Sequence, residues 1–141
     1  MNNEPSMDEA FLEKLREAVE ENLGNEDFGV QELAREAGLS RSQIHRKLHE
    51  LTGQSTTKFI REIRLEHAME MLQKEVGTVS EIAYRVGFSS PTYFSTCFHE
   101  YYGFPVKVTS IKSKRNYALY TAIVSLAFVL LAGYYYFQSS S

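Results

Sequence analysis

The sequence contains two copies of one short unit, and this internal repeat constrains the fold more than any other feature. The segment VQELAREAGLS at residues 30–40 matches VSEIAYRVGFS at residues 79–89 with a spacing of 49 residues. The spacing becomes 50 after one extra residue near Pro91. In each copy, a short segment with apolar residues at helical spacing is followed by a glycine and then by a second segment with the same kind of spacing. The repeat therefore predicts two similar pairs of helices.

Each copy has the pattern of a helix-turn-helix. In the first copy, residues 30–53, an apolar helical face leads to Gly38, where a helix is expected to end with a positive φ. Ser40 and Gln43 form a capping box that opens the next helix. The second copy, residues 79–103, has Gly87 at the same turn. The residues expected on the buried side of the second helices are Ile44, Leu48, Leu51, Phe94, Phe98 and Tyr101.

One continuous linker helix is predicted between the two units, over residues 56–75, because apolar residues recur there at helical spacing. With a rise of about 1.5 Å per residue, it separates the units by roughly 27 to 30 Å. One turn of B-DNA measures about 34 Å, so both second helices could enter successive major grooves. An acidic leader, residues 1–29, is predicted to contain a first helix from Met7 to Leu23. Its apolar residues should pack toward the first unit, and its acidic face should be solvated. The predicted fold is all-α.

The formal net charge of −3 conceals a division of charge along the chain. Residues 1–30 hold nine acidic side chains and two basic ones, whereas residues 31–115 hold thirteen basic and nine acidic ones. The middle of the chain is therefore mildly cationic. This charge permits a polyanionic partner without requiring one.

The combined motifs resemble the DNA-binding domain of the AraC/XylS family of bacterial transcription regulators, over residues 7–108. The resemblance rests on Arg64-Leu65 with Ala68 and Leu72, on EIAYRVGF, on Tyr93-Phe94 and on Phe98. It implies seven helices, two helix-turn-helix units and binding to promoter DNA. The sequence departs from the family pattern at GFPVKVTS, where Pro105 comes one residue early and an aromatic-basic pair is missing. It also has Thr96 where the family often has Arg or Lys.

In each unit the second helix would be the recognition helix, the one that enters the major groove. If Ile44 and Leu48 face inward, the opposite face of the recognition helix of the first unit is left to contact base edges. Arg46 is the strongest candidate, because its planar guanidinium can bind a guanine edge with two hydrogen bonds, whereas Lys47 is expected to reach a phosphate. The predicted DNA-binding residues are Arg41, Ser42, Gln43, His45, Arg46 and Lys47 in the first unit and Thr92, Ser95 and Thr96 in the second. The second set has no positive charge, so the second helix of that unit could mainly pack against the core and position the domain on the DNA. The simplest alternative for both sets is a solvated face.

Motifs for catalysis, cofactors or metals are weak. His45 and His49 are four residues apart, a spacing that can bind zinc, but no third ligand lies near them in the sequence. Cys97 is expected to be a small core residue, and the single cysteine allows no internal disulfide. No glycine-rich phosphate loop is present. The sequence therefore predicts no catalytic site, no cofactor and no metal site.

Residues 117–137 form a run of 21 residues without charge, which as a helix would cover roughly 31 Å, the thickness of a bilayer core. The run follows a basic juxtamembrane linker, residues 109–116, and precedes a short tail, residues 138–141. The basic linker predicts a single pass through the inner membrane with the DNA-binding domain in the cytoplasm. A face on which four of five residues are small suggests pairing into a homodimer; the face comprises Ala118, Ala122, Ser125, Val129 and Ala132.

These observations predict a membrane-tethered, sequence-specific regulator that binds double-stranded DNA. The alternative is a membrane-anchored module whose helix-turn-helix surfaces bind a protein and make little or no contact with DNA. The two hypotheses differ in the salt dependence that they predict for DNA binding.

Overall fold

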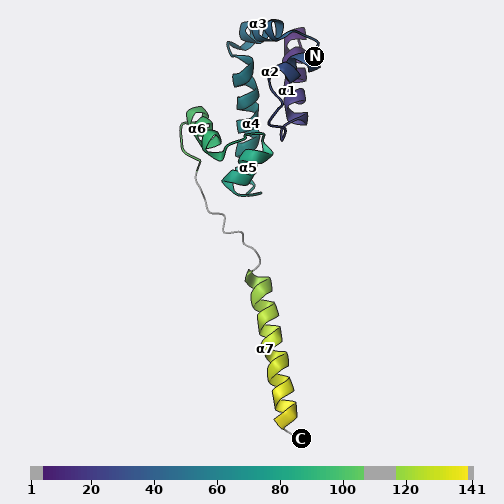
Figure 1. Ribbon diagram of the computed structural model, residues 1–141, viewed down its shortest axis with the longest axis vertical. Coiled ribbons are helices and arrows are strands. Elements are labelled where there is room, and N and C mark those ends of the chain that lie inside the picture. Colours follow the sequence, from purple (N-terminus) through teal and green to yellow (C-terminus); the bar gives the residue numbers. More distant parts are fainter. Residues whose placement is uncertain (1–4, 107–116, 140–141) are drawn as a thin grey trace. The chain divides into compact units, whose positions relative to one another are not determined.

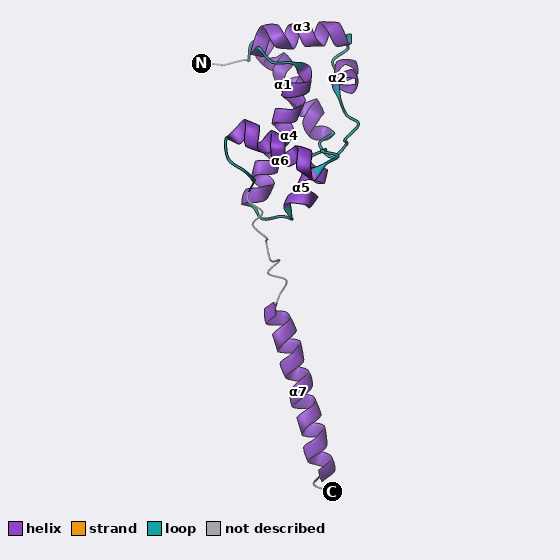
Figure 2. Cartoon of the chain, turned by 60° about the vertical axis from the view of Figure 1, so that its left-hand side comes forward, coloured by secondary structure: helices purple, strands orange, loops and turns teal. Residues whose placement is uncertain are grey.

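The computed structural model describes residues 5–106 and 117–139, and within these ranges it contains seven helices and no strand (Figures 1 and 2). The prediction of an all-α fold is confirmed. The helices are α1 (Met7–Glu21), α2 (Val30–Glu36), α3 (Arg41–Thr52), α4 (Thr56–Gln73), α5 (Val79–Arg85), α6 (Pro91–Tyr102) and α7 (Tyr117–Ser139). The chain divides into two compact units, residues 1–108 and 109–141.

The first unit contains α1 to α6, and the resemblance implied one helix more for this domain. Residues 107–116 lie outside the described ranges. Within the described part, α2 with α3 and α5 with α6 form the two predicted helix pairs, and α4 runs from one pair to the other (Figure 1).

The turns of the two pairs have the predicted local structure. Gly38 and Gly87 have φ values of +68° and +87°, which favour glycine because a side chain is strained there. Ser40 and Gln43 form the predicted capping box, in which the backbone N–H of Ser40 donates to Oε1 of Gln43 at 2.8 Å. In the second pair Ser90, not Ser89, caps the recognition helix. The extra residue of the repeat therefore lies in this turn.

Two hydrophobic clusters form the core, and α4 contributes to both of them. Ile60 and Ile63 lie in the first cluster, with residues of α1, α2 and α3, whereas Leu65 and Ala68 lie in the second, with residues of α5 and α6. A single helix thus carries both pairs. Both recognition helices therefore pack on α4.

Several predicted positions need correction. Tyr101 is 38% exposed, and Tyr102 packs against the second cluster in its place. Leu23 lies beyond the end of α1 and packs against the second cluster, not against the first unit as predicted. The linker helix ends at Gln73, two residues before the predicted boundary, because Glu75 has a positive φ of 52°.

Polar contacts from α4 tie the two pairs together. The guanidinium of Arg64 donates to the carbonyl oxygens of Asn25 and Phe28, at 2.9 and 3.0 Å, in the loop before α2. It also donates to the carbonyl oxygen of Gly87, at 3.1 Å, in the turn before α6. Partial burial lowers the pKa of Arg64, but an arginine stays charged at neutral pH. Arg64 therefore joins the loop beside the first pair to the turn of the second.

A second connection passes through Glu66 on α4. Its carboxylate accepts hydrogen bonds from Arg16 of α1, at 2.8 Å, and from the hydroxyl of Tyr101 of α6, at 3.1 Å. Burial and the bond to Glu66 raise the pKa of Tyr101 to about 12. The hydroxyl therefore keeps its proton and remains a donor at neutral pH.

The second unit consists, in its described part, of α7. Within this helix Thr121–Ser139 is long and apolar enough to cross a membrane, and none of it is buried. A core helix of a soluble protein or a signal sequence can have the same length and apolar composition. The predicted basic linker at 109–116 and the side chain of Ala118 in the predicted small-residue face lie outside the described part.

Candidate nucleic-acid interface

The outward face of α3 is polar and exposed. Ile44 and Leu48 are fully buried, and their burial turns the opposite side of the helix to solvent. All but one of the residues predicted to contact DNA in this unit are exposed, namely Arg41, Ser42, Gln43, His45 and Arg46. The structure thus brings together on one helix the cations and hydrogen-bonding groups that base recognition requires.

Two of these side chains already have partners within the protein. The side-chain oxygen of Gln43 accepts the capping hydrogen bond from Ser40, so its amide N–H groups are the part left for DNA. Lys47 is half-buried, and its ammonium lies 4.0 Å from the centre of the Phe11 ring on α1. This cation–π contact holds Lys47 against α1. A phosphate contact by Lys47 stays a prediction.

The rings of His45 and His49 stack with their centres 6.2 Å apart. Among the described residues no group of three His, Cys, Asp or Glu side chains could hold a metal ion. Cys97 is buried in the second cluster, as predicted. The two histidines therefore belong to the polar surface at α3.

A shallow groove lies between the start of α3 and the first turn of α4. It is lined by Arg41, Ser42 and His45 of α3, together with Val30, Ser55, Thr56 and Thr57. The N-terminal turn of α4 carries the partial positive charge of a helix start. The groove therefore favours an anionic group beside the recognition helix.

The outward face of α6 differs sharply from that of α3. Thr92 and Thr96 are exposed and Ser95 is half-buried. The hydroxyl of Ser95 donates to the carbonyl of Pro91 at 2.9 Å, and that of Thr96 donates to the carbonyl of Thr92 at 3.2 Å. These two hydroxyl protons are used within the helix, and α6 contains no Lys or Arg. Methyl groups and acceptor oxygens remain for contact with DNA.

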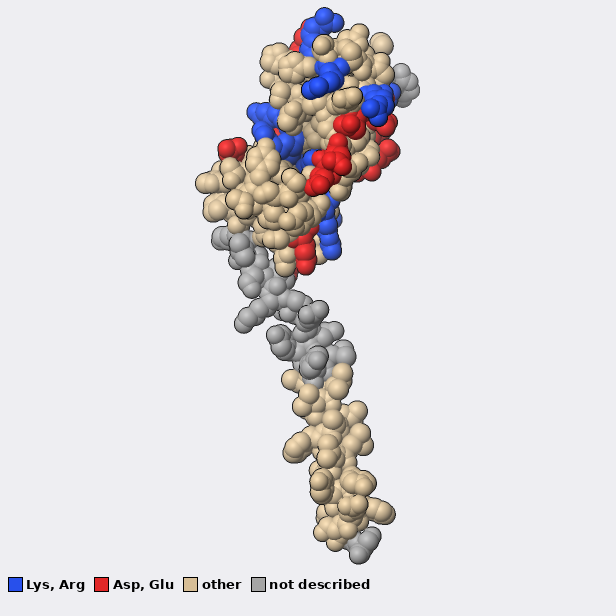
Figure 3. All heavy atoms as spheres, viewed as in Figure 1, with Lys and Arg blue, Asp and Glu red and all other residues tan. Residues whose placement is uncertain are grey.

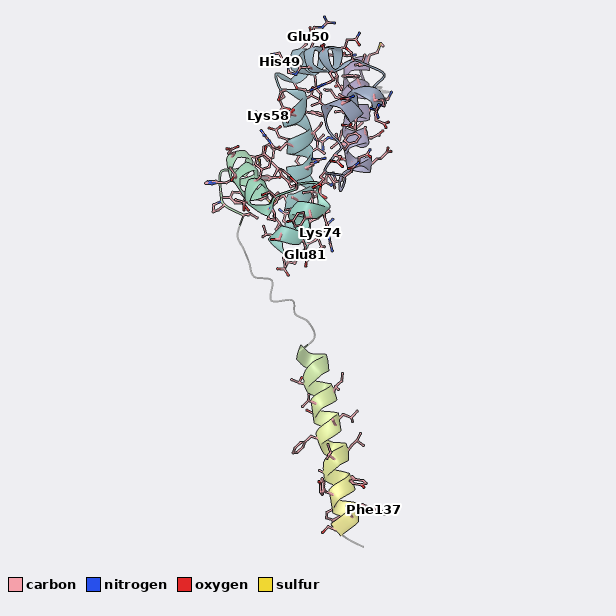
Figure 4. All side chains as sticks on the ribbon, in the orientation of Figure 1. His49, Glu50, Lys58, Lys74, Glu81 and Phe137 are labelled. Carbon is pink, nitrogen blue, oxygen red and sulfur yellow. The ribbon has the colours of Figure 1, made fainter. Side chains whose placement is uncertain are left out.

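The sequence reasoning missed a polar surface on α4 between the two pairs. A second groove there is lined by Thr57 and Arg61 of α4, by Val30 of the first pair, and by Ser89 and Tyr93 of the second pair. Nη1 of Arg61 donates to the hydroxyl of Tyr93 at 3.3 Å. Figure 4 shows Lys58 projecting from α4 in the region between α3 and α6. The signal in the sequence was the pair of basic residues, Lys58 and Arg61, early in the linker helix.

Basic and acidic side chains are unevenly distributed on the face drawn in Figure 3. In this view basic side chains lie over α3 and over α4 between α3 and α6, with an acidic side chain beside α6, and most acidic side chains lie over the side of α1 and α2. The acidic residues of α1 include Asp8, Glu9, Glu13, Glu17, Glu20 and Glu21. Polyanions are therefore favoured on the side of α4 and disfavoured on the side of α1.

Comparison with known proteins places this domain in a family. The family described as "Helix-turn-helix domain" matches residues 33–110, which is more than half of the chain. A protein named histidine kinase P4 from Formosa agariphila is 41% identical over 95 residues, which cover 67% of this chain and 7% of that protein. The chain spans a third or less of the length of the curated relatives that it matches.

Solved structures agree with the family match. A transcriptional regulator from Chromobacterium violaceum, described by its AraC-type DNA-binding domain, is 26% identical with a TM-score of 0.62, over 68% of this chain and 85% of that one. The DNA-binding domain of the transcriptional factor AdpA, in complex with a target DNA, is 29% identical with a TM-score of 0.60, over 67% and 84% of the two chains. The chain therefore belongs to the family of AraC-type helix-turn-helix DNA-binding domains.

Proposed function

We propose that this chain is a sequence-specific transcription regulator that binds double-stranded DNA through α3 and α6. The observation that carries the proposal is the pairing of two similar units on one helix, with the polar face of α3 exposed. The AdpA domain, which is similar in fold and sequence, is in complex with a target DNA. The AraC-type domain is non-catalytic, and the similarity to a histidine kinase covers 7% of that protein. No kinase activity is therefore proposed for this chain.

In this proposal α3 provides most of the base recognition. Arg46 would donate two hydrogen bonds to one guanine edge, and His45 and Ser42 would contact neighbouring bases. Arg41 lies at the start of the helix, beside the groove at α4, where a phosphate fits its charge. In the second unit Thr92 and Thr96 would contact thymine methyl groups or phosphates.

The length of α4 fits two contacts on one face of a duplex. The helix has 18 residues, and at a rise of about 1.5 Å per residue it is about 27 Å long. One turn of B-DNA measures about 34 Å. The two recognition helices would therefore enter successive major grooves with modest bending of the DNA.

A second part of the proposal concerns the location of the protein. The span predicted at residues 117–137 would anchor the chain in the inner membrane, with the DNA-binding domain in the cytoplasm. Support comes from the length, apolar composition and exposure of Thr121–Ser139, and from the basic residues that precede α7 in the sequence. The small-residue face of the helix, which includes Ala122 and Ser125, would let two copies pair in the bilayer.

The competing function is a protein-interaction module built on the same scaffold. The lack of positive charge on α6 favours it. The salt dependence of binding distinguishes the two functions. Each phosphate contact releases counterions, so affinity for DNA falls steeply with salt, whereas binding to a protein groove need not.

The experiment is selection of duplexes from a random pool by the full chain in detergent micelles. Affinity for the selected duplex is then measured by fluorescence anisotropy from about 0.05 to 0.2 M salt. We expect one enriched motif and a clearly negative log-log slope, because each phosphate contact contributes about −0.9. An unenriched pool with a slope near zero would favour the interaction module.

A further inference from the structure

The two recognition helices differ in charge, and this difference raises the question of what holds the second unit to DNA. α3 contains Arg41, Arg46 and Lys47, whereas α6 contains no Lys or Arg. Phosphate contacts dominate the affinity of DNA-binding proteins. If α3 and α6 were the only contacts, the second unit would add little binding energy. A cation supplied by another element would remove this imbalance.

Arg61 of α4 occupies the position that such a cation needs. It lines the groove between the two pairs, together with Thr57 of α4, Ser89 of the second turn and Tyr93 in the first turns of α6. Glu26, in the loop before α2, also lines this groove. Thr57 also lines the groove beside Arg41 and His45. Thr57 therefore lies in both grooves, which follow α4 from the start of α3 to the start of α6.

Arg61 forms no close ion pair among the described residues, although its hydrogen bond with Tyr93 and the nearby Glu100 raise its pKa. Its hydrogen bond is to the hydroxyl of Tyr93, a neutral group, and no carboxylate among the described residues lies within 4.0 Å of its guanidinium nitrogens. Other cations near α4 are engaged: Lys58 pairs with Glu62 at 3.7 Å, and Arg64 donates to three backbone carbonyls. A guanidinium has five N–H donors, so most donors of Arg61 remain for an external acceptor.

Tyr93 fixes the direction of this guanidinium. Its hydroxyl accepts the bond from Arg61, and its own proton remains available as a donor. The ring of Tyr93 is 51% exposed and packs on Phe88, with the ring centres 5.9 Å apart. The packing holds the hydroxyl at the groove. Arg61 and Tyr93 thus present several donors to one small anion.

We propose that α4 is a third DNA-contacting element, in which Arg61, with Tyr93 and Thr57, binds a phosphate of the backbone strand that runs between the two major grooves. The inference rests on the proposed DNA-binding function. A guanidinium matches a phosphate with two parallel hydrogen bonds, and a phosphate contact positions the protein without reading sequence. Arg61 therefore supplies the second unit with the charge that α6 lacks.

The test compares the salt dependence of the full-length variants in micelles on two duplexes of equal length, the selected one and an unrelated one. Arg61→Gln should weaken binding roughly tenfold on both duplexes and reduce the log-log slope by about 0.9, the contribution of one phosphate. Tyr93→Phe should weaken binding by several-fold with an unchanged slope, because it removes a neutral donor. Thermal unfolding of each variant checks that the fold is intact.

The matched control is Arg85→Gln. Arg85 carries the same charge, donates to the carbonyl of Val76 and lines neither groove. We expect its affinity and slope to equal those of the unmodified protein. An unchanged slope in Arg61→Gln, or an equal change in Arg85→Gln, overturns the phosphate site alone. An unmodified protein that binds neither duplex overturns the proposed function and the phosphate site with it.

Discussion

Replacement of Arg64 by methionine should destabilise the whole DNA-binding domain. The change keeps an apolar stem of similar length but removes three hydrogen bonds, to the carbonyls of Asn25, Phe28 and Gly87. A hydrogen bond from a charged group contributes about 1.5 to 3 kcal/mol. Arg64 is only partly buried, and its lowered pKa reflects a cost of burying the charge. Discounted for this cost, the three bonds together should contribute about 3 kcal/mol.

The assay is urea unfolding followed by far-ultraviolet circular dichroism. With a slope of about 1.5 kcal/mol per M urea, a loss of about 3 kcal/mol lowers the midpoint by roughly 2 M. Arg85→Met removes one exposed bond, to Val76, and should cost about 0.5 kcal/mol or less. A loss below about 1 kcal/mol in Arg64→Met would refute the claim that Arg64 joins the two pairs.

Three further predictions concern the turns, the bases and the membrane. A Cβ at Gly87 would lie 2.5 Å from the carbonyl oxygen of Leu23, whereas one at Gly38 meets nothing within 4 Å. Thermal melts should therefore show that Gly87→Ala costs about 3 kcal/mol and Gly38→Ala about 1 kcal/mol, and equal costs would contradict this packing. Arg46→Ala should cost roughly 1 to 3 kcal/mol of binding on one operator at fixed salt and relax specificity at one base, with a much smaller loss for Thr96→Ala; comparable losses would contradict the predicted asymmetry. Cell fractionation should find the full chain in membranes and a chain ending before α7 in the soluble fraction, and a soluble full chain would exclude the anchor.

The sequence predicts the helices well, because local signals determine them. Helical periodicity and the cap at Ser40 depend on neighbours within a few residues, and these neighbours are visible in the chain. Helix ends are less certain: the positive φ of Glu75 ends α4 two residues before the predicted boundary. Tyr102, not the predicted Tyr101, packs against the core. One step along a helix turns a side chain by about 100°, so an error of one residue in the predicted register exchanges a buried side chain for an exposed one.

The contacts between the two pairs were not predictable from one sequence. Arg64 bonds to backbone carbonyls, which every residue has, so its partners 23 to 39 residues away leave no mark in the sequence. Glu66 appeared only as a residue of the linker helix, yet it connects α1 with α6. The position of Arg61 between the two recognition helices depends on how both pairs pack on α4, which no local pattern in the sequence encodes.

Hydroxyl-radical footprinting of the selected duplex tests the central claim most directly. If both recognition helices bind one face of the DNA, each strand should show two protected patches separated by about 10 base pairs, one helical turn. At a temperature where it remains folded, Arg64→Met should reduce the protection of the patch bound by the second unit more than that of the patch bound by the first. A single protected patch, or two patches whose separation differs from one helical turn, would contradict the account.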